Sequence, residues 1–491
     1  MPRRQLAETV RTLSVLGPVS RALTSSPTSA NPLSAQVSPD DAIYFDLFRH
    51  GTVPSTCSFF PSDFWTENIM QLSHSEPAFW HVTVALGVLH QRAELLVIAK
   101  KKDDETLTRR AEAHYGKAMA LAKDLESNVK VATLSIALVA AASLLNRLSE
   151  MQKHILAGLK IASQQGAARH STYHMLQGSL MRTDLQAMSF SPSDSPYPYE
   201  DSEASYAVDQ FLTSPPPPGT SLEQLSSEFF GMARSYFLLD DGLLSGSVPY
   251  GPWITKFDGF LRRLVQWESK MEHYEASHQL TPAEQTVAMS LRLYHIMYRL
   301  LMRAGPLGPE SRYDDALGFF EYAVRLAATV VARTRNVNTV GLSLEPGVII
   351  PMWMAIHRCR HYSLRHAALR VMKEAQRVEG MWRSDAVAVI MGSLVATEEE
   401  SLGPITAAAY DPAQLEFASL DIPWRAWSRP SFDIPASISW SDVPMIPENK
   451  RVRELLGTPK MSERRVHIRL LMCPESTEDV FGGIRDYIIN F

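Results

Sequence analysis

The sequence predicts an all-α protein, a bundle or array of helical hairpins in two lobes, with a small β-hairpin at the C-terminal end. Three observations predict this fold. Apolar residues recur at a spacing of three and four along most of the chain, as they do on one face of an α-helix. A proline-rich segment, 189–220, interrupts this pattern. Near the end of the chain the period changes to two, which is typical of β-strands.

These changes of pattern divide the chain into five parts. In order, they are a disordered N-terminal tail, an N-terminal helical lobe, a Pro/Ser-rich acidic linker, a C-terminal helical lobe, and a wrap rich in proline and tryptophan that ends in the hairpin. They cover residues 1–38, 39–188, 189–220, 221–421 and 422–491.

The first lobe contains three segments with helical spacing, Phe79–Leu96, Ala111–Leu125 and Val131–Leu145. Short polar breaks such as Glu126–Asn128 separate them, and short connections place consecutive helices antiparallel. The third segment is mostly apolar, but it is shorter than the roughly 20 residues that a membrane span needs. We therefore expect helical hairpins with a buried third helix, and no membrane partner.

The linker combines prolines with an absence of basic residues. It includes the run Pro215–Pro218, and no Lys or Arg occurs between Arg182 and Arg234. Such a segment buries too little apolar surface to offset its ordering entropy, so it is predicted to be mobile. Within it, Tyr197–Leu212 mixes acidic and aromatic residues, as activation segments that bind coactivators do; a plain surface linker is the alternative.

In the second lobe, helical spacing resumes over Leu291–Leu301 and Phe319–Val331. The wrap, which begins at Ile422, is expected to follow the surface and to be anchored by aromatic side chains. At the end, Val466–Met472 alternates apolar and polar residues, and with Tyr487–Ile489 it predicts the hairpin. The anchoring residues are Trp424, Trp427 and Trp440.

Charge and cysteine content argue against direct DNA binding. The 491 residues carry a formal net charge of −5, whereas domains that bind nucleic acid usually carry a basic surplus. The three cysteines, Cys57, Cys359 and Cys473, lie far apart, and none forms the Cys-x-x-Cys pair of a zinc site. Scattered cysteines also fit a reducing compartment without disulfides.

One short motif suggests catalysis. Arg49-His50-Gly51-Thr52 resembles the Arg-His-Gly motif of histidine phosphatases, in which a histidine at the end of a strand accepts phosphate. The preceding residues, Ile43–Phe48, fit a helix as well as a strand, and no alternation of strands and helices follows. A chance match is therefore the preferred interpretation.

Histidines and paired aspartates are the remaining candidate ligands. His74, His81 and His90 are spaced by seven and nine residues, which does not place two of them on successive helical turns. Aspartate pairs in a helical protein suggest a terpene synthase, but the acidic motif that holds magnesium is incomplete at each pair, so caps and solvated turns are preferred. We therefore predict no catalytic, cofactor-binding or metal-binding residues, and no enzyme. The pairs are Asp40–Asp41, Asp103–Asp104, Asp240–Asp241 and Asp314–Asp315.

A dense basic run extends from Arg358 to Arg377. A DNA-binding helix would show such a run, and so would a solvated face or a set of intramolecular ion pairs, which is the preferred interpretation. Its members are Arg358, Arg360, His361, Arg365, His366, Arg370, Lys373 and Arg377.

Two groups of motifs resemble the fungal-specific transcription factor domain, the all-helical regulatory half of fungal zinc-cluster regulators. The resemblance covers most of the chain from about Tyr44 to Phe491. The early group consists of Phe59–Trp65, His74–Ala78 and Ala85–His90. The late group consists of Glu345–Met352, Cys359–Arg360, Leu364–Arg365, Ala367–Leu369 and Glu379–Trp382.

This resemblance implies a nuclear regulator of a fungal metabolic pathway or biosynthetic gene cluster. The six-cysteine zinc cluster that grips DNA in this family does not occur in the sequence, either because it was lost or because an upstream exon is missing. We therefore expect DNA to be reached only indirectly, through other transcription regulators or coactivators, and a homo- or hetero-oligomer stays open. A helical interaction scaffold without a transcriptional role is the alternative.

Two basic segments bear on location. Met1–Ala30 has four arginines, many hydroxyl residues and Glu8 as its one acid, which resembles a mitochondrial presequence; a disordered tail is the alternative. Lys450-Arg451-x-Arg453 and Arg464-Arg465 form a loose bipartite pattern for nuclear import; ordinary surface charge before a strand is the alternative. The nucleus is the expected location, and mitochondria are the alternative.

Overall fold

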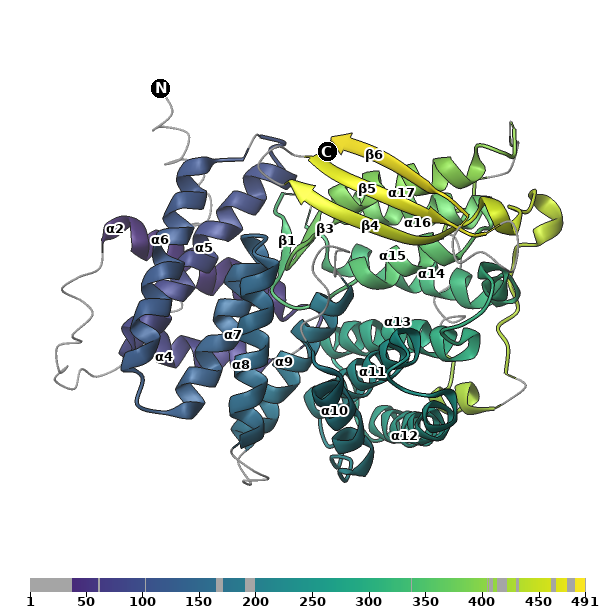
Figure 1. Ribbon diagram of the computed structural model, residues 1–491. Coiled ribbons are helices and arrows are strands. Elements are labelled where there is room, and N and C mark those ends of the chain that lie inside the picture. The colour runs from purple at the N-terminus through teal and green to yellow at the C-terminus, as the bar shows by residue number, and fades with distance from the viewer. Residues whose placement is uncertain are drawn as a thin grey trace. The chain divides into compact units, whose positions relative to one another are not determined.

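Helices form most of the structure, as the sequence predicts (Figure 1). The computed structural model describes Ser38 to Asn490, which form one compact unit. The residues outside the description are 1–37, 61, 102, 165–170, 190–198, 337, 404, 406–408, 413–421, 430–431, 461–464, 475–481 and 491. Residues 1–37 of the predicted N-terminal tail therefore lie outside the described residues, whereas Ser38 caps α2.

The N-terminal part consists of paired helices. Helices α5 and α6 coincide with the first two predicted segments and pack side by side, and the third segment, α7, packs against α8. Nearly every side chain of α7 from Ala132 to Leu144 is buried, which confirms the prediction of a buried helix. The elements are α2 (Pro39–Leu47), η1 (Phe48–Thr52), α3 (Val53–Thr56), η2 (Phe64–Asn68), α4 (Ile69–Ser75), α5 (Pro77–Val97), α6 (Glu105–Leu121), η3 (Ala122–Asp124), α7 (Asn128–Leu144), α8 (Leu148–Gln164) and α9 (Ser171–Ser189).

The C-terminal part contains the longer helices. Local chemistry defines their ends: Thr281 and Glu284 form a capping box at the start of α13, and α11 ends at Gly246, whose φ of 82° suits a residue without a side chain. The helices are α10 (Asp201–Thr213), α11 (Leu222–Ser245), α12 (Tyr250–Ser277), α13 (Pro282–Ala304), α14 (Leu317–Thr334), α15 (Ile349–Arg358), α16 (Tyr362–Glu374) and α17 (Ser384–Glu399). Short 3₁₀ helices are η4 (Glu310–Ala316), η6 (Trp424–Ser428), η7 (Trp440–Asp442) and η8 (Glu448–Lys450).

The segment predicted as a mobile linker contains an ordered helix, so that expectation is wrong for Asp201–Thr213. Helix α10 buries Val208 and stacks Phe211 on Phe260 of α12, with ring centroids 5.7 Å apart. Its acidic side carries Asp209, which pairs with Lys256 at 2.8 Å. Amphipathic spacing within the proline-rich segment thus gives a helix that docks on its neighbours.

Two small sheets complete the fold. The predicted hairpin is β5 (Arg465–Met472) with β6 (Ile484–Asn490), and β4 (Val452–Lys460) adds a third antiparallel strand that the sequence did not predict. The other sheet was also not predicted: β1 (Gly341–Ser343) runs parallel to β2 (Arg377–Glu379), which pairs with β3 (Trp382–Arg383). Trp382 itself is buried.

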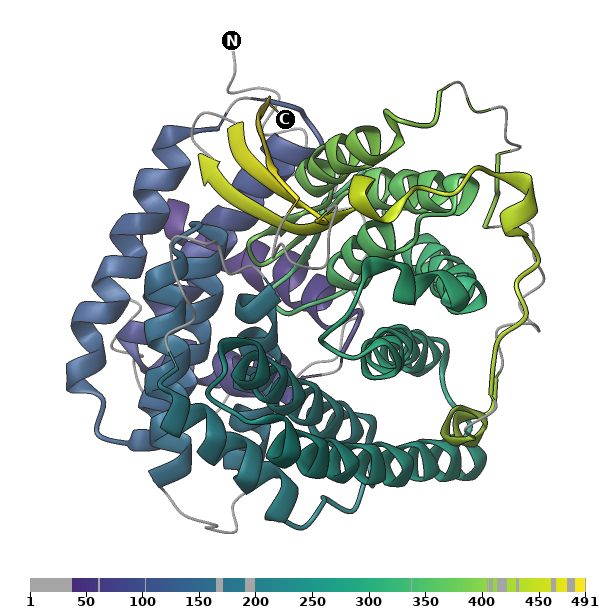
Figure 2. The same cartoon turned by 45° about the vertical axis from the view of Figure 1, so that its right-hand side comes forward.

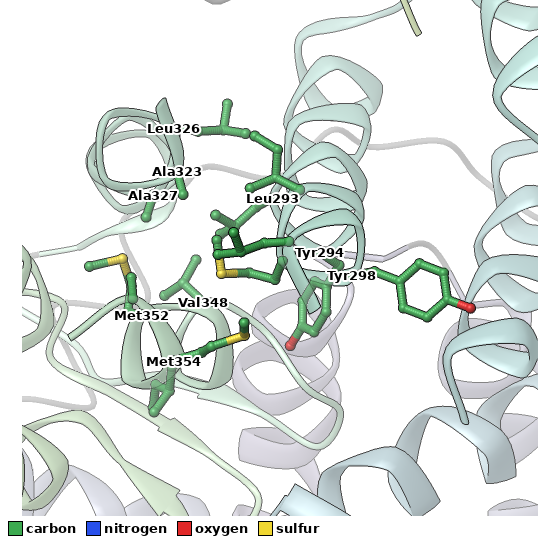
Figure 3. Close-up of a cluster of buried hydrophobic side chains, with 14 of the residues drawn as sticks. Leu293, Tyr294, Tyr298, Ala323, Leu326, Ala327, Val348, Met352 and Met354 are labelled. Atoms are coloured by element: carbon green, nitrogen blue, oxygen red, sulfur yellow. The ribbon is translucent and has the colours of Figure 1, made fainter. Parts of the chain in front are cut away.

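The buried apolar side chains form two clusters, and the sheet of β1, β2 and β3 contributes side chains to both of them. One cluster fills the N-terminal helices, and the other fills the C-terminal helices; Figure 3 shows part of the latter, where side chains of α13, α14 and α15 meet. Five side chains of the later sequence belong to the N-terminal cluster. They are Val340, Leu342, Leu344, Val378 and Met381.

The wrap is anchored as predicted. In Figure 2 it runs down the outer side of the C-terminal helices to η6, beside α12. Trp424 and Trp427 of η6 are buried, and Trp424 packs edge-on against Trp267 with ring centroids 5.2 Å apart. The Trp424 indole nitrogen donates to the Glu275 carboxylate at 2.8 Å, so the polar atom of this buried ring is satisfied.

Candidate functional site

The phosphatase-like motif lies on a helical surface. Ile43–Phe48 belongs to α2 and the first residue of η1, not to a strand, and Arg49 and His50 follow on η1 with exposed side chains. The geometry that a phosphohistidine site needs, a histidine at a strand end facing anion-binding arginines, is not formed there.

The three candidate histidines have separate environments. His74 is exposed and packs edge-on against Phe45. His81 and His114 face each other with their Nδ1 atoms 3.1 Å apart, and His90 is buried with its Nδ1 atom 2.9 Å from the Thr52 hydroxyl. Among the described residues, no three His, Cys, Asp or Glu side chains are grouped so that they would hold a metal ion.

Most of the aspartate pairs act as caps or in ion pairs. Asp104 caps α6 by accepting from the Thr106 amide at 2.9 Å, and Asp103 accepts hydrogen bonds from Nε and Nη2 of Arg92. Asp314 receives a bidentate pair from Arg451, at 2.8 and 2.7 Å. The prediction of caps is confirmed at Asp104, while Asp103 and Asp314 lie in ion pairs.

Asp240 differs from the predicted solvated turn. It lies in the last turns of α11 and accepts a hydrogen bond from the Trp253 indole nitrogen at 3.0 Å. Burial raises the pKa of this carboxyl group to about 6, although hydrogen bonds from Trp253 and Tyr236 lower it. Asp240 is therefore a half-buried carboxyl of the helix interior.

The most distinctive site is the buried Glu345 carboxylate, which forms an ion pair with Arg182 and a hydrogen bond with Trp65. Glu345, in the loop between β1 and α15, accepts from the Trp65 indole nitrogen at 3.1 Å. Arg182 of α9 donates its Nε to the same carboxylate at 2.6 Å and its Nη2 at 3.2 Å. All three side chains are at most 2% exposed. Since a buried carboxylate without donors is very costly, this contact fixes three distant parts of the chain together.

A second buried carboxylate, Glu379 of β2, lies at the start of α15. It accepts from the backbone amides of Gly347, Val348 and Ile349 at 2.9, 2.9 and 3.0 Å, so it caps the helix where the macrodipole favours a negative charge. A Cβ atom on Gly347 would lie 2.4 Å from its Oε1, which explains the glycine there. Arg377 also donates to this carboxylate, at 3.1 Å.

The basic run forms intramolecular ion pairs. Arg360 and Arg365 are at most 1% exposed, and they share Glu398 of α17 at 3.3 and 2.5 Å. Burial raises the pKa of the Glu398 carboxyl, but the two guanidinium groups outweigh burial, so that the net shift is downward. The same carboxylate accepts the Val452 amide at 2.6 Å and thereby holds the start of β4. Of the eight basic residues, Arg370 and Lys373 are exposed.

An open groove of about 880 Å³ lies between α12 and Leu212–Pro216. Arg263 donates to the carbonyl oxygen of Leu212 at 3.1 Å, and Lys270 to that of Pro217 at 2.7 Å. These contacts hold the segment that follows α10 against α12. The α12 wall carries the cations Lys256, Arg262, Arg263 and Lys270.

The chain matches no protein-family model and shows no significant similarity to any curated protein or solved structure. No helix in the described part of the chain is long and apolar enough to span a membrane.

Glu345 and Glu379 both belong to the late group of motifs, but the sequence predicted no role for either side chain. Each lies next to a glycine-containing turn, Pro346-Gly347 or Gly380, and Glu345 also lies in a largely apolar stretch. An acid in such a setting is a signal for a buried carboxylate that accepts backbone amides or a guanidinium.

Replacing Glu345 with glutamine should destabilise the protein by about 3 kcal/mol, because the change leaves the Arg182 guanidinium buried without its counter-charge. Urea unfolding followed by circular dichroism measures this cost. Adding Arg182→Met should recover part of the loss. The matched control is Glu272→Gln, which removes a carboxylate from the more exposed pair with Arg425 and should cost less than about 1 kcal/mol. Equal costs for both glutamine variants would contradict the role assigned to Glu345.

The buried His90 should make the protein less stable in acid. Burial lowers the pKa of His90 from 6.5 to about 4, so between these values the unfolded chain binds a proton that the folded chain does not. Stability should therefore fall as pH decreases from about 6.5 to 4, by about 3 kcal/mol for this residue. His90→Gln should make that pH profile less steep, with the remaining slope coming from other histidines whose pKa burial lowers, such as His81 and His295. The exposed control His273→Gln should leave the slope unchanged. A profile that His90→Gln leaves as steep as before would show that His90 does not titrate in this way.

Proposed function

We propose that this protein is a transcription-factor-like regulator of a fungal metabolic pathway or biosynthetic gene cluster that reaches DNA through protein partners. The observation that carries the proposal is the meeting of the two motif groups. Trp65 of the early group and Glu345 of the late group, 280 positions apart, form a buried hydrogen bond. Motifs that resemble one regulatory domain thus lie together in one folded unit, which supports the proposal.

A second connection between the groups, made through Arg377, supports this proposal, because this side chain contacts Phe59 of the early group and Glu379 of the late group. The Arg377 guanidinium lies 3.9 Å from the ring centroid of Phe59, and Arg377 also binds Glu379. The family-like residues therefore form one connected interior structure, in which Glu345 and Glu379 each accept donors from distant segments.

The charges of the folded chain favour an indirect route to DNA. Two arginines of the basic run, Arg360 just before α16 and Arg365 on α16, are buried against Glu398. Arg451, part of the import-like pattern, is buried and paired with Asp314. With a net charge of −5, the chain offers no strong electrostatic attraction to phosphates. We propose that the partners are other transcription regulators or coactivators, and that the protein acts in the nucleus.

The isolated chain should bind DNA weakly, without sequence preference, and with an affinity that decreases steeply with salt. Binding of a labelled promoter fragment, compared with scrambled DNA at two salt concentrations, measures this property. The double variant Arg370→Ala/Lys373→Ala removes the exposed cations of the basic run and serves as the comparison. Tight binding to one short site, lost in this variant, would contradict the proposal.

In cells, deleting the gene should change the transcripts of one pathway or cluster, and chromatin occupancy of the tagged protein should disappear when its zinc-cluster partner is deleted. Unchanged transcripts would favour the second candidate function, a helical interaction scaffold. That candidate is supported by the docked acidic helix α10, which presents Tyr206 with 65% of its surface exposed.

A further inference from the structure

The last strand of the chain leaves one edge of its sheet open. In the sheet order β4-β5-β6, β6 pairs with β5 along one side and with no other described strand along the other (Figure 1). The opposite edge is different, because the start of β4 is held by Glu398 and Arg360 through the Val452 amide and carbonyl groups. Open backbone donors and acceptors along a strand are a template for another strand.

The side chains of β6 make this edge unusually apolar. Ile484 and Ile488 are 59% and 72% exposed, and Ile488 is the most exposed large hydrophobic side chain among the described residues. Between them, on the same face, Asp486 lies 3.2 Å from His467 and 3.3 Å from Arg469 of β5. The charged residues of β6, Arg485 and Asp486, are engaged with Glu400 and with β5. Two exposed isoleucines therefore remain as apolar surface on a seven-residue edge strand, which is the mark of a binding surface.

We propose that β6 pairs antiparallel with β6 of a second copy of this chain, about a two-fold axis at Asp486. The pairing would join two three-stranded sheets into one continuous sheet of six strands. Ile484 of each copy would then lie opposite Ile488 of the other copy, which gives two equivalent apolar pairs. Such a self-complementary contact is what a two-fold interface requires.

The sequence of β6 selects this register. Residues opposite each other across an antiparallel pair lie on the same face, so the axis passes through a residue of the strand. An axis at Arg485 would set Ile484 against Asp486, and an axis at Tyr487 would set Ile488 against Asp486. An axis at Ile488 would leave Ile484 beyond the end of the second strand. The register at Asp486 pairs both exposed isoleucines.

Charge is compatible with this register. The two Asp486 carboxylates would face each other, which alone would be unfavourable. Each carboxylate already has His467 and Arg469 of its own copy within 3.3 Å, so two negative groups would share four basic side chains. A single strand pair buries less area than a standard stable interface, so the expected dimer is weak, with a Kd in the micromolar range.

Sedimentation equilibrium of the full chain tests the pairing. The wild-type protein should show a concentration-dependent dimer, and Ile488→Lys should weaken its dimerisation at least tenfold, because the two-fold axis brings each lysine opposite an isoleucine and removes both apolar pairs. The matched control Ile43→Lys changes a 58% exposed isoleucine of α2 and should leave the dimer unchanged. Circular dichroism confirms that both variants are folded.

Cysteine crosslinking tests the register. In Asp486→Cys the two new residues would be directly opposite, about 5 Å apart between Cα atoms, within the range of a disulfide. In Ile488→Cys they would be about 13 Å apart, which is too far. The three native cysteines should form few competing disulfides, because burial keeps their thiols protonated. Burial raises the pKa of Cys57 and Cys473 to about 12 and that of Cys359 to about 11. Under oxidising conditions, Asp486→Cys should give a covalent dimer and Ile488→Cys should not.

A wild-type protein that stays monomeric at every concentration would overturn the proposal, as would equal weakening by Ile43→Lys. Crosslinking of Ile488→Cys in place of Asp486→Cys would overturn the register. The inference rests on the sheet alone, so its failure would leave the proposed regulatory function unaffected, and the DNA-binding and transcript experiments do not depend on it.

Discussion

The burial of two carboxylates, Glu345 and Glu379, is the constraint on which the rest of the fold depends. A charged group removed from water is stable only where several donors converge on it. Glu345 accepts hydrogen bonds from Arg182 and Trp65 of the N-terminal half, and Glu379 accepts hydrogen bonds from three backbone amides at the start of α15. Because their donors come from segments far apart in the sequence, the N-terminal helices, the small sheet and α15 must assemble together.

A third buried carboxylate, Glu398, positions the C-terminal sheet. Glu398 of α17 forms ion pairs with two guanidinium groups of the basic run and accepts a hydrogen bond from the first amide of β4. The ion pairs that neutralise this run therefore also hold the last sheet in place. The dense positive charge of the sequence is therefore used inside the molecule. The exposed sheet edge at β6 lies at the far side of the same sheet, where its isoleucines are not covered.

The sequence predicted what depends on local pattern. Periodicity located α5, α6, α7, α13 and α14, and alternation located β5. The apolar run Tyr487–Ile489 located β6, and tryptophans located the anchors of the wrap. It failed where tertiary contacts decide. The strands β1 to β3 have two or three residues each, which is too few to show a period. In β4, Gly457 and Pro459 are residue types that are uncommon inside strands, so the sequence pattern did not predict a strand there. Composition suggested a mobile linker where apolar contacts at Val208 and Phe211 stabilise α10. The division into lobes, by contrast, stays a prediction. The roles of Glu345 and Glu379 depend on partners far away in the sequence, which one sequence does not reveal.

The central claim is that these buried carboxylates make the two hydrophobic clusters one cooperative structure. Native-state hydrogen exchange tests it most directly, by comparing the slowest amides of α7 in the N-terminal cluster with those of α13 in the C-terminal cluster. The account predicts the same opening free energy for both helices in the wild-type protein, and the same dependence on denaturant. Two distinct opening free energies, with one cluster exchanging while the other stays protected, would contradict it.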